Sequence, residues 1–218
     1  MVDAMDSTSA GSATGHILVV CTANVCRSPL ARFLLARDFG SAGLPGWQVT
    51  SAGVSAVDGA SMCPESAAAI RRTSAGRHFE EQHGAHLLTA SDLADADLVL
   101  VASQEVRAGV IALETEARAR TFTLLEAAGL AAQAVEADMA VGPAVKDLTA
   151  TLHACRGFLP PARLSLRERM VPPRRRAIDG IDITDAHSGE ARHIDVTDAV
   201  VRASWELATT VVRLSAAA

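Results

Sequence analysis

The strongest constraint on the fold is the segment 21–28, which reads CTANVCRS. It follows the apolar run 16–20, HILVV, and precedes a helix-like segment that starts at Pro29. This order predicts a buried strand, a tight loop and the first turn of a helix. Such a loop gathers backbone N–H groups and a helix N-terminus around one centre, and a centre of this kind binds anions.

Cys21 and Arg27 give the predicted anion site its chemistry. A positive field favours the thiolate form of Cys21 and so makes it a nucleophile, while Arg27 can hold two oxygens of a tetrahedral anion. A cysteine that ends an apolar strand is otherwise a small core residue. Asn24 tolerates left-handed backbone, Ser28 can donate to the thiolate, and Pro29 suits the first turn of a helix. Together these residues predict phosphoryl transfer to sulfur.

The segment resembles the loop of the low-molecular-weight protein-tyrosine-phosphatase family, which reads Cys, five residues, Arg, Ser, with an Asn and a second Cys inside. The resemblance covers residues 16–126 and 178–214, in the bacterial type of the family. It implies an α/β fold: a four-stranded parallel sheet with helices on both faces and the phosphate-binding loop after the first strand. It also implies a metal-independent phosphomonoester hydrolase, a protein-tyrosine phosphatase with a phosphocysteine intermediate.

The resemblance also assigns the catalytic roles. Cys21 is expected to attack phosphorus and Arg27 to hold the phosphoryl oxygens, while Asp185 protonates the leaving oxygen. The residues alone leave the acid open among Asp179, Asp182, Asp185, Asp195 and Asp198. The family's acid follows a short Asp-x-x spacing and precedes the last helix, and this favours Asp185.

Further loop residues receive supporting roles from the resemblance. Cys26 corresponds to the family's second cysteine, a disulfide partner that protects Cys21 from deeper oxidation. Ser51 is expected to support the loop through a hydrogen bond to Asn24. The residues expected to bind substrate are Thr22, Ala23, Asn24, Val25, Cys26 and Ser28.

The chain departs from the family pattern at the acid and in its aromatic content. Ala186 and His187 follow Asp185, where the family has proline and then an aromatic residue. The chain has no tyrosine and two tryptophans, so the aromatic walls that usually sandwich a phosphotyrosine ring are thin. Two alternatives therefore stay open: a thiol-dependent arsenate reductase, which shares this fold and a related loop, and a catalytically silent phosphate-binding module.

Periodicity and composition predict one domain, residues 16–218, after a disordered tail, 1–15. Residues 129–177 are expected to form an insertion, helical at first and then a basic linker that contains Arg163–Arg176. The final helix, 195–214, is expected to pack on the sheet with Trp205 in the core. The other expected elements are strands 17–20, 47–52, 97–101 and 121–124, helices 28–39, 63–73 and 104–116, and a polar loop, 76–84.

Composition limits the function classes. The chain has 218 residues, 49% of them hydrophobic, and this suits one compact core. Its net charge of −5 argues against nucleic-acid binding, and its apolar runs are too short to span a membrane.

The chain has four cysteines and no C-x-x-C pair, which argues against a disulfide scaffold or a zinc site. This cysteine usage favours a location in the reducing cytoplasm. Cys63 and Cys155 are interpreted as structural or incidental thiols. No cofactor or metal is expected, the histidines 78, 83 and 86 being irregularly spaced. The expected partner is a phosphorylated protein or a small phosphomonoester, and the oligomeric state stays open.

Overall fold

The computed structural model of the chain describes residues 15–44, 46–157, 177–189 and 191–217. The basic segment Arg163–Arg176 lies outside the described residues, as does the predicted tail apart from its last residue. That residue, Gly15, already belongs to the first strand, because it pairs in register with Trp47. The predicted end of the tail is therefore one residue too late.

The centre of the fold is a parallel sheet of four strands in the order β2-β1-β3-β4, which confirms the predicted fold class. The strands are β1 (Gly15–Cys21), β2 (Trp47–Gly53), β3 (Leu98–Val101) and β4 (Thr121–Thr123). Along β1, alternate residues face two different apolar cores: Ile17 and Val19 face one, and Leu18 and Val20 face the other. Because both faces are covered, the strands read as continuous apolar runs.

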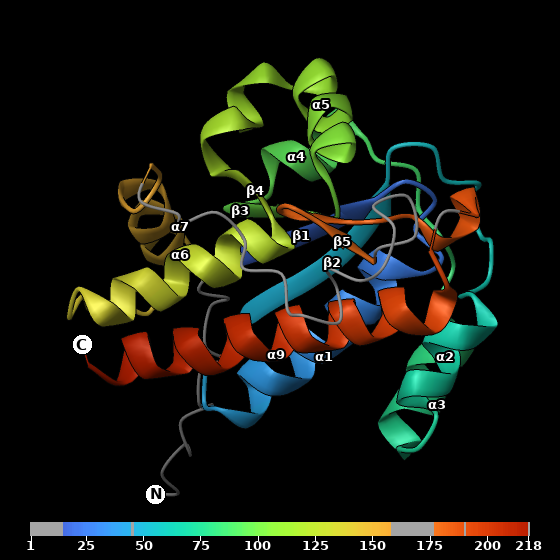
Figure 1. Cartoon of the computed structure of the whole chain (residues 1–218), viewed down its shortest axis with the longest axis horizontal. Helices are drawn as coiled ribbons and strands as arrows, with labels where there is room; N and C mark the ends of the chain where they lie inside the picture. Colours follow the sequence, from blue (N-terminus) through green and yellow to red (C-terminus); the bar gives the residue numbers. More distant parts are fainter. Residues whose placement is uncertain (1–14, 45, 158–176, 190, 218) are drawn as a thin grey trace, which may run out of the picture.

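Helices cover both faces of this sheet (Figure 1). One face carries α1 (Arg27–Ser41), α6 (Leu124–Glu136) and α9 (His193–Ala216), with α7 (Val145–Ala154) beside α6. The other face carries α4 (Ala90–Ala94), α5 (Gln104–Leu113) and the 3-10 helix η1 (Thr115–Arg120). The shorter elements are α2 (Pro64–Ile70), α3 (Ser74–Gln82), the antiparallel pair β5 (Ile178–Asp179) and β6 (Asp182–Ile183), and η3 (Ala186–Ser188).

Two predictions about elements were wrong. The polar loop expected at residues 76–84 is mostly helix α3. The expected insertion stays a prediction; its first residue, 129, lies within α6, where Leu130 and Ala134 are buried in the core. Trp205, expected in the core, is 60% exposed, because the buried face of α9 runs through Ala203 and Leu207 instead.

The strand order places the loop after β1 at a topological switch point. The chain leaves β1, crosses through α1 to β2 on one side, and later returns to β3 on the other side of β1. The two connections diverge at the carboxyl ends of these strands, where open α/β sheets bind their ligands. None of the described helices has the length and apolar character that crossing a bilayer requires.

Candidate active site

The loop between β1 and α1 is built around Asn24. This residue is fully buried and has a positive φ of 54°, as its tolerance of left-handed backbone predicts. Its Nδ2 donates to Ser28 Oγ at 2.8 Å, and its Oδ1 accepts from the backbone N–H of His86 at 2.9 Å. Its backbone oxygen lies 2.9 Å from His83 Nε2. Residues 83–86, which sequence reasoning did not connect with the loop, therefore hold its centre.

Cys21 ends β1 with its sulfur enclosed by hydrogen-bond donors. The side chain of Ser28 donates to Cys21 Sγ at 3.1 Å, and the backbone N–H of Asn24 lies 3.3 Å from the same sulfur. The predicted contact of Ser28 with the thiol is present. Donors directed at sulfur stabilise negative charge there, so this arrangement suits a thiolate nucleophile.

The neighbouring strand β2 supports the loop through Gly53 rather than Ser51. The predicted hydrogen bond from Ser51 to Asn24 is absent: Ser51 Oγ is buried without a partner among the described residues. Ser51 pairs with Val19, two residues before Cys21, and so lies too far down the strand to reach the loop. At Gly53, in contrast, an added Cβ would lie 2.7 Å from the backbone nitrogen of Asn24. The loop can approach β2 closely at this position because glycine has no side chain.

Arg27 joins the loop to the segment that carries the predicted acid. Its side chain is buried, its Nη1 donates to the carbonyl of Ile183 at 2.9 Å, and its Nη2 donates to Thr22 Oγ1 at 3.0 Å. The same Nη2 forms an ion pair with the carboxylate of Asp185, whose other oxygen accepts from the N–H of His187 at 2.9 Å. Asp185, 158 residues from Arg27 in the sequence, therefore lies at the loop as predicted.

A second pair of thiols adjoins the loop. Cys26 Sγ lies 3.0 Å from Ser66 Oγ, and Cys63 Sγ lies 3.5 Å from the same hydroxyl. The hydrogen bond between the two thiols raises the pKa of Cys26 and lowers that of Cys63 to about 5. The backbone N–H of Cys63 also donates to the carbonyl of Val25 at 2.7 Å. Cys63, expected to be an incidental thiol, is thus a neighbour of the loop, a contact that no local motif predicts.

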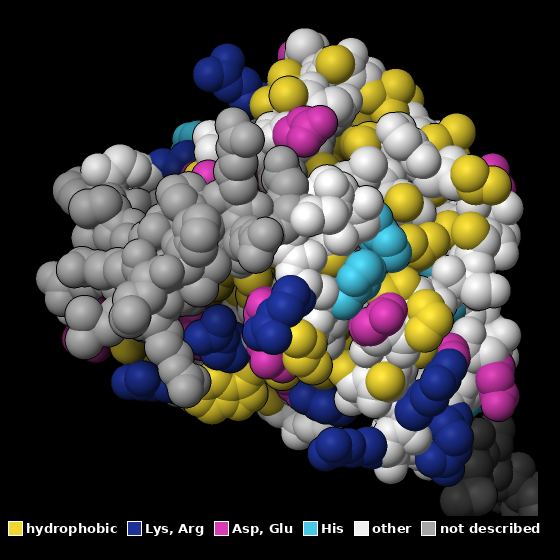
Figure 2. Space-filling model, turned by 45° about the vertical axis from the view of Figure 1, so that its right-hand side comes forward, with side chains coloured by type: hydrophobic (Ala, Val, Ile, Leu, Met, Phe, Trp, Pro, Cys, Tyr) yellow, Lys and Arg dark blue, Asp and Glu magenta, His cyan; other side chains and the backbone are white. Residues whose placement is uncertain are grey.

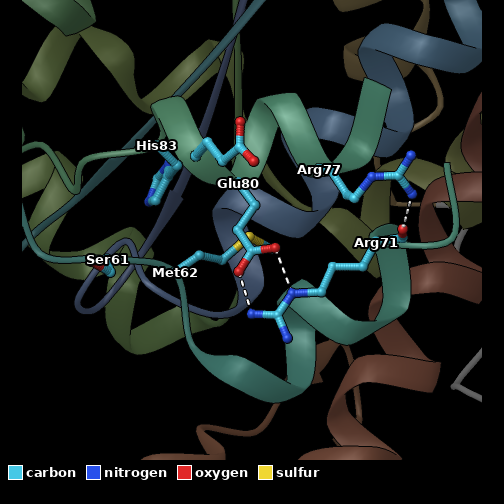
Figure 3. Close-up of a pocket in the computed structure, with 7 residues that line it drawn as sticks. Ser61, Met62, Arg71, Arg77, Glu80 and His83 are labelled. Atoms are coloured by element: carbon cyan, nitrogen blue, oxygen red, sulfur yellow. Dashed lines mark hydrogen bonds and ion pairs between the residues drawn. The ribbon is translucent and has the colours of Figure 1, made fainter. Parts of the chain in front are cut away.

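A cleft of about 400 Å³ lies between α2 and α3 (Figure 3). The carboxylate of Glu80 holds the guanidinium of Arg71 through two nitrogens, and Arg77 donates to the carbonyl of Arg71 at 3.0 Å. His83, at one end of the cleft, links it to Asn24. Neither Cys21 nor Arg27 lines this cleft, so the cleft is separate from the site predicted at the loop.

Comparison with known proteins identifies what the chain is similar to. The family model for low molecular weight phosphotyrosine protein phosphatase matches residues 16–139. The chain is 34% identical over 109 residues to the low molecular weight protein-tyrosine-phosphatase Ptp of Acinetobacter johnsonii, covering 50% of this chain and 71% of that protein. It is 33% identical over 109 residues to a protein-arginine-phosphatase of Geobacillus stearothermophilus, covering 50% and 68%.

Solved structures agree on the fold. The solution structure of a low molecular weight protein tyrosine phosphatase from Bacillus subtilis matches with a TM-score of 0.57 at 20% identity, over 91% of this chain and 97% of that one. The sequence matches are shorter, and the aligned segments span between 53% and 71% of the curated relatives Ptp, EpsP and Etp.

Proposed function

Because the chain belongs to the low molecular weight phosphotyrosine protein phosphatase family, a class of cysteine-dependent and metal-independent phosphatases, we propose that Cys21, Arg27 and Asp185 carry its reaction. The observation that supports these roles is the geometry around Arg27. Its guanidinium contacts the carboxylate of Asp185, and the loop that it closes holds Cys21 Sγ between two donors. Cys21, Arg27 and Asp185 thus lie close together at one end of the sheet, and this supports the proposed roles.

The first step transfers the phosphoryl group to sulfur. The Cys21 thiolate attacks phosphorus, the S–P bond forms, and the bond from phosphorus to the leaving oxygen breaks. Asp185 gives its proton to that oxygen. Arg27 and the loop N–H groups from Thr22 to Arg27 hold the equatorial oxygens, where charge is concentrated in the transition state.

The second step regenerates the enzyme. Asp185, now a carboxylate, takes a proton from water as the water oxygen attacks phosphorus. The S–P bond breaks, inorganic phosphate leaves, and Cys21 returns to the thiolate. Asp185 forms an ion pair with Arg27, so this contact must break before Asp185 can act. A bound phosphoryl group replaces Asp185 as the partner of the guanidinium, and Asp185 is then free to approach the leaving oxygen.

The roles are tested with para-nitrophenyl phosphate, without metal and with reductant. We expect Cys21→Ser to abolish turnover and Asp185→Asn to lower kcat by about 10²- to 10⁴-fold, the usual contribution of a general acid. Asp179→Asn, at an exposed position in the β5–β6 pair, is the matched control and should keep the wild-type rate. An undiminished rate in either of the first two variants would remove the role assigned to that residue.

The proposed substrate is a protein phosphotyrosine, as the name of the Acinetobacter relative suggests. Protein phosphoarginine is the second candidate, because the Geobacillus relative is named a protein-arginine-phosphatase. The chain also has no tyrosine and only two tryptophans, so few aromatic side chains could flank a phosphotyrosine ring. The two are separated by kcat/KM on matched peptides that differ only in the phosphorylated residue. We expect the phosphotyrosine peptide to be faster, and the opposite order would establish the second candidate.

Cys26 is proposed to protect the nucleophile from oxidation. Peroxide converts the Cys21 thiolate to a sulfenic acid with release of hydroxide, and attack by the Cys26 thiol then forms a disulfide and releases water. We expect a thiol reductant to restore activity after peroxide treatment of the wild type but not of Cys26→Ser. Equal recovery in both would exclude this role.

The described cysteines are all free thiols, and this supports a cytoplasmic location. Cell fractionation tests the location: recovery of the protein outside the cytoplasmic fraction would contradict it.

A further inference from the structure

The thiols of Cys26 and Cys63 belong to a cluster that the proposed phosphatase reaction does not use. A ring nitrogen of His187 lies with both sulfurs, all three atoms within 4.8 Å of one another. Cys63 also belongs to a second trio with Glu65 and His193, again within 4.8 Å. Four separate segments supply these groups: the loop before α1, the start of α2, η3, and the start of α9.

The two histidines lie together. His193 Nε2 is 3.4 Å from His187 Nδ1, and the rings meet nearly edge to face with centroids 4.6 Å apart. Figure 2 shows histidine side chains grouped at the surface beside acidic and apolar ones. The two cysteines of the cluster are buried, with 4% and 5% exposure, while His187 and Glu65 are exposed. The cluster is therefore closed on the thiol side and open to solvent on the imidazole side.

We propose that this cluster binds one zinc-like divalent cation, held by Cys26, Cys63 and His187. The fourth position is left to water or to a side chain of the second trio, which shares Cys63 with the first. Zinc takes four ligands from thiolate, imidazole and carboxylate groups in a tetrahedron. With bond lengths of about 2.0 to 2.3 Å, neighbouring ligand atoms of such a tetrahedron lie about 3.3 to 3.8 Å apart. The ligand atoms of Cys26, Cys63 and His187 lie within 4.8 Å of one another, so shifts of about 1 Å bring them to these separations.

The proposed cation has no part in the chemistry at phosphorus; it ties the acid segment to the loop. His187 lies two residues after Asp185, and Cys26 lies one residue before Arg27. A metal bound to both fixes the distance between the segments that carry the acid and the anion-binding arginine. It also occupies the thiol of Cys26, so the protective disulfide with Cys21 cannot form while the metal is bound. The cation would therefore prevent formation of the protective disulfide and restrict movement of the segment that carries Asp185.

Cobalt(II) added to the reduced, metal-free full-length chain tests the proposal, because its spectrum reports both geometry and ligand type. We expect about one ion per chain, strong visible absorption typical of tetrahedral cobalt, and a sulfur-to-metal charge-transfer band in the near ultraviolet. Zinc should displace the cobalt and remove the colour. Inorganic zinc should also raise the thermal unfolding midpoint as its concentration increases.

Variants locate the bound ion. We expect Cys63→Ser to lower the charge-transfer intensity by about half, because one of the two thiolate ligands is lost. Cys63→Ser and His187→Gln should each weaken cobalt binding by more than about tenfold, since losing even a residue that only supports a ligand costs about tenfold in metal affinity. Cys155→Ser and His153→Gln, which change the same residue types outside the cluster, should bind as the wild type does. Cys21→Ser should bind equally well, and this makes the test independent of phosphatase activity.

Three results would overturn the proposal. One is the absence of a tetrahedral thiolate spectrum in the reduced wild type. Another is unchanged affinity in both Cys63→Ser and His187→Gln. The third is loss of the spectrum in Cys21→Ser, which would assign the ion to the catalytic thiol. Because Cys63 is buried, far-ultraviolet circular dichroism without metal must first confirm that its variant folds; if it does not, His187→Gln, at an exposed position, decides the question alone.

Discussion

Gly53 determines how closely β2 approaches the phosphate-binding loop. A Cβ at this position would lie 2.7 Å from the nitrogen of Asn24 and from the carbonyl oxygen of Thr22, and both atoms belong to the backbone. We therefore expect Gly53→Ala to displace the loop and to lower kcat/KM for an aryl phosphate by about 10²-fold, the cost of a displacement near 1 Å. Steady-state kinetics on the folded variant measures this loss.

The control for Gly53→Ala is Gly40→Ala at the exposed end of α1, where an added Cβ meets nothing within 4 Å. It should keep the wild-type rate and stabilise the fold by up to about 1 kcal/mol, because alanine is the better helix former. If Gly53→Ala were as active as Gly40→Ala, the close approach of β2 would not matter for catalysis.

Residue roles were predictable where they depend on neighbours in the sequence. Asn24 and Ser28 act within the loop that contains them, so residue type and spacing were enough to predict the left-handed backbone and the contact with Cys21. Ser51 and His83 depend instead on strand register and on a segment that returns to the loop from 59 positions away. Neither can be read from spacing, which explains why the first role was wrong and the second was missed.

The C-terminal helix α9 buries one of its large apolar side chains and exposes another only two residues away. Leu207 is 1% exposed in the core that α9 shares with α1 and α6, whereas Trp205 is 60% exposed. We expect Leu207→Ala to lower the free energy of unfolding by about 2 to 5 kcal/mol, and Trp205→Ala to change it by about 0.5 kcal/mol or less. Urea denaturation of the two variants measures the difference, and a larger loss for Trp205→Ala would contradict the placement of this helix.

Elements were predictable where they bury many apolar residues. The strands read as apolar runs and α1 buries several large side chains, but α3 fully buries only Gly76. It packs Phe79 against Phe33 and is capped by Thr73, whose Oγ1 accepts from Gly76 N at 3.0 Å. Its polar sequence therefore resembles a loop. The strands β5 and β6 have two residues each, too few for alternation to show. Their position instead follows from tertiary bonds such as that of Ile183 N–H to the carbonyl of Ala102 at 2.8 Å.

At the scale of the whole molecule, the switch point at the carboxyl end of β1 gathers segments that are distant in sequence. The family resemblance predicted the sheet and the place of Asp185 before the last helix, because it implies the order of the elements. The cluster of Cys26, Cys63, His187 and His193 could not be predicted in the same way, since its members follow no metal-binding spacing. Only the return of η3 and α9 to the loop brings them together.

The same convergence makes the stability of the whole chain sensitive to His83. Burial lowers the pKa of this imidazole, and the charge of Arg32 lowers it further, although the hydrogen bond to the carbonyl of Asn24 acts in the opposite direction. His83 Nδ1 is buried and has no partner among the residues that the structure describes, so a proton there would be unsatisfied.

Because its pKa is lowered on folding, the unfolded chain binds more protons than the folded chain at and below the ordinary value of 6.5. Stability should therefore fall as the pH falls through this range and recover above it. We expect His83→Gln, which keeps a donor for the carbonyl of Asn24, to flatten this dependence. His78→Gln, at an exposed position within α3, the helix that His83 follows, should leave it unchanged. Urea unfolding over a pH series measures each slope, and equal slopes in the wild type and His83→Gln would show that this imidazole does not couple the loop to the global fold.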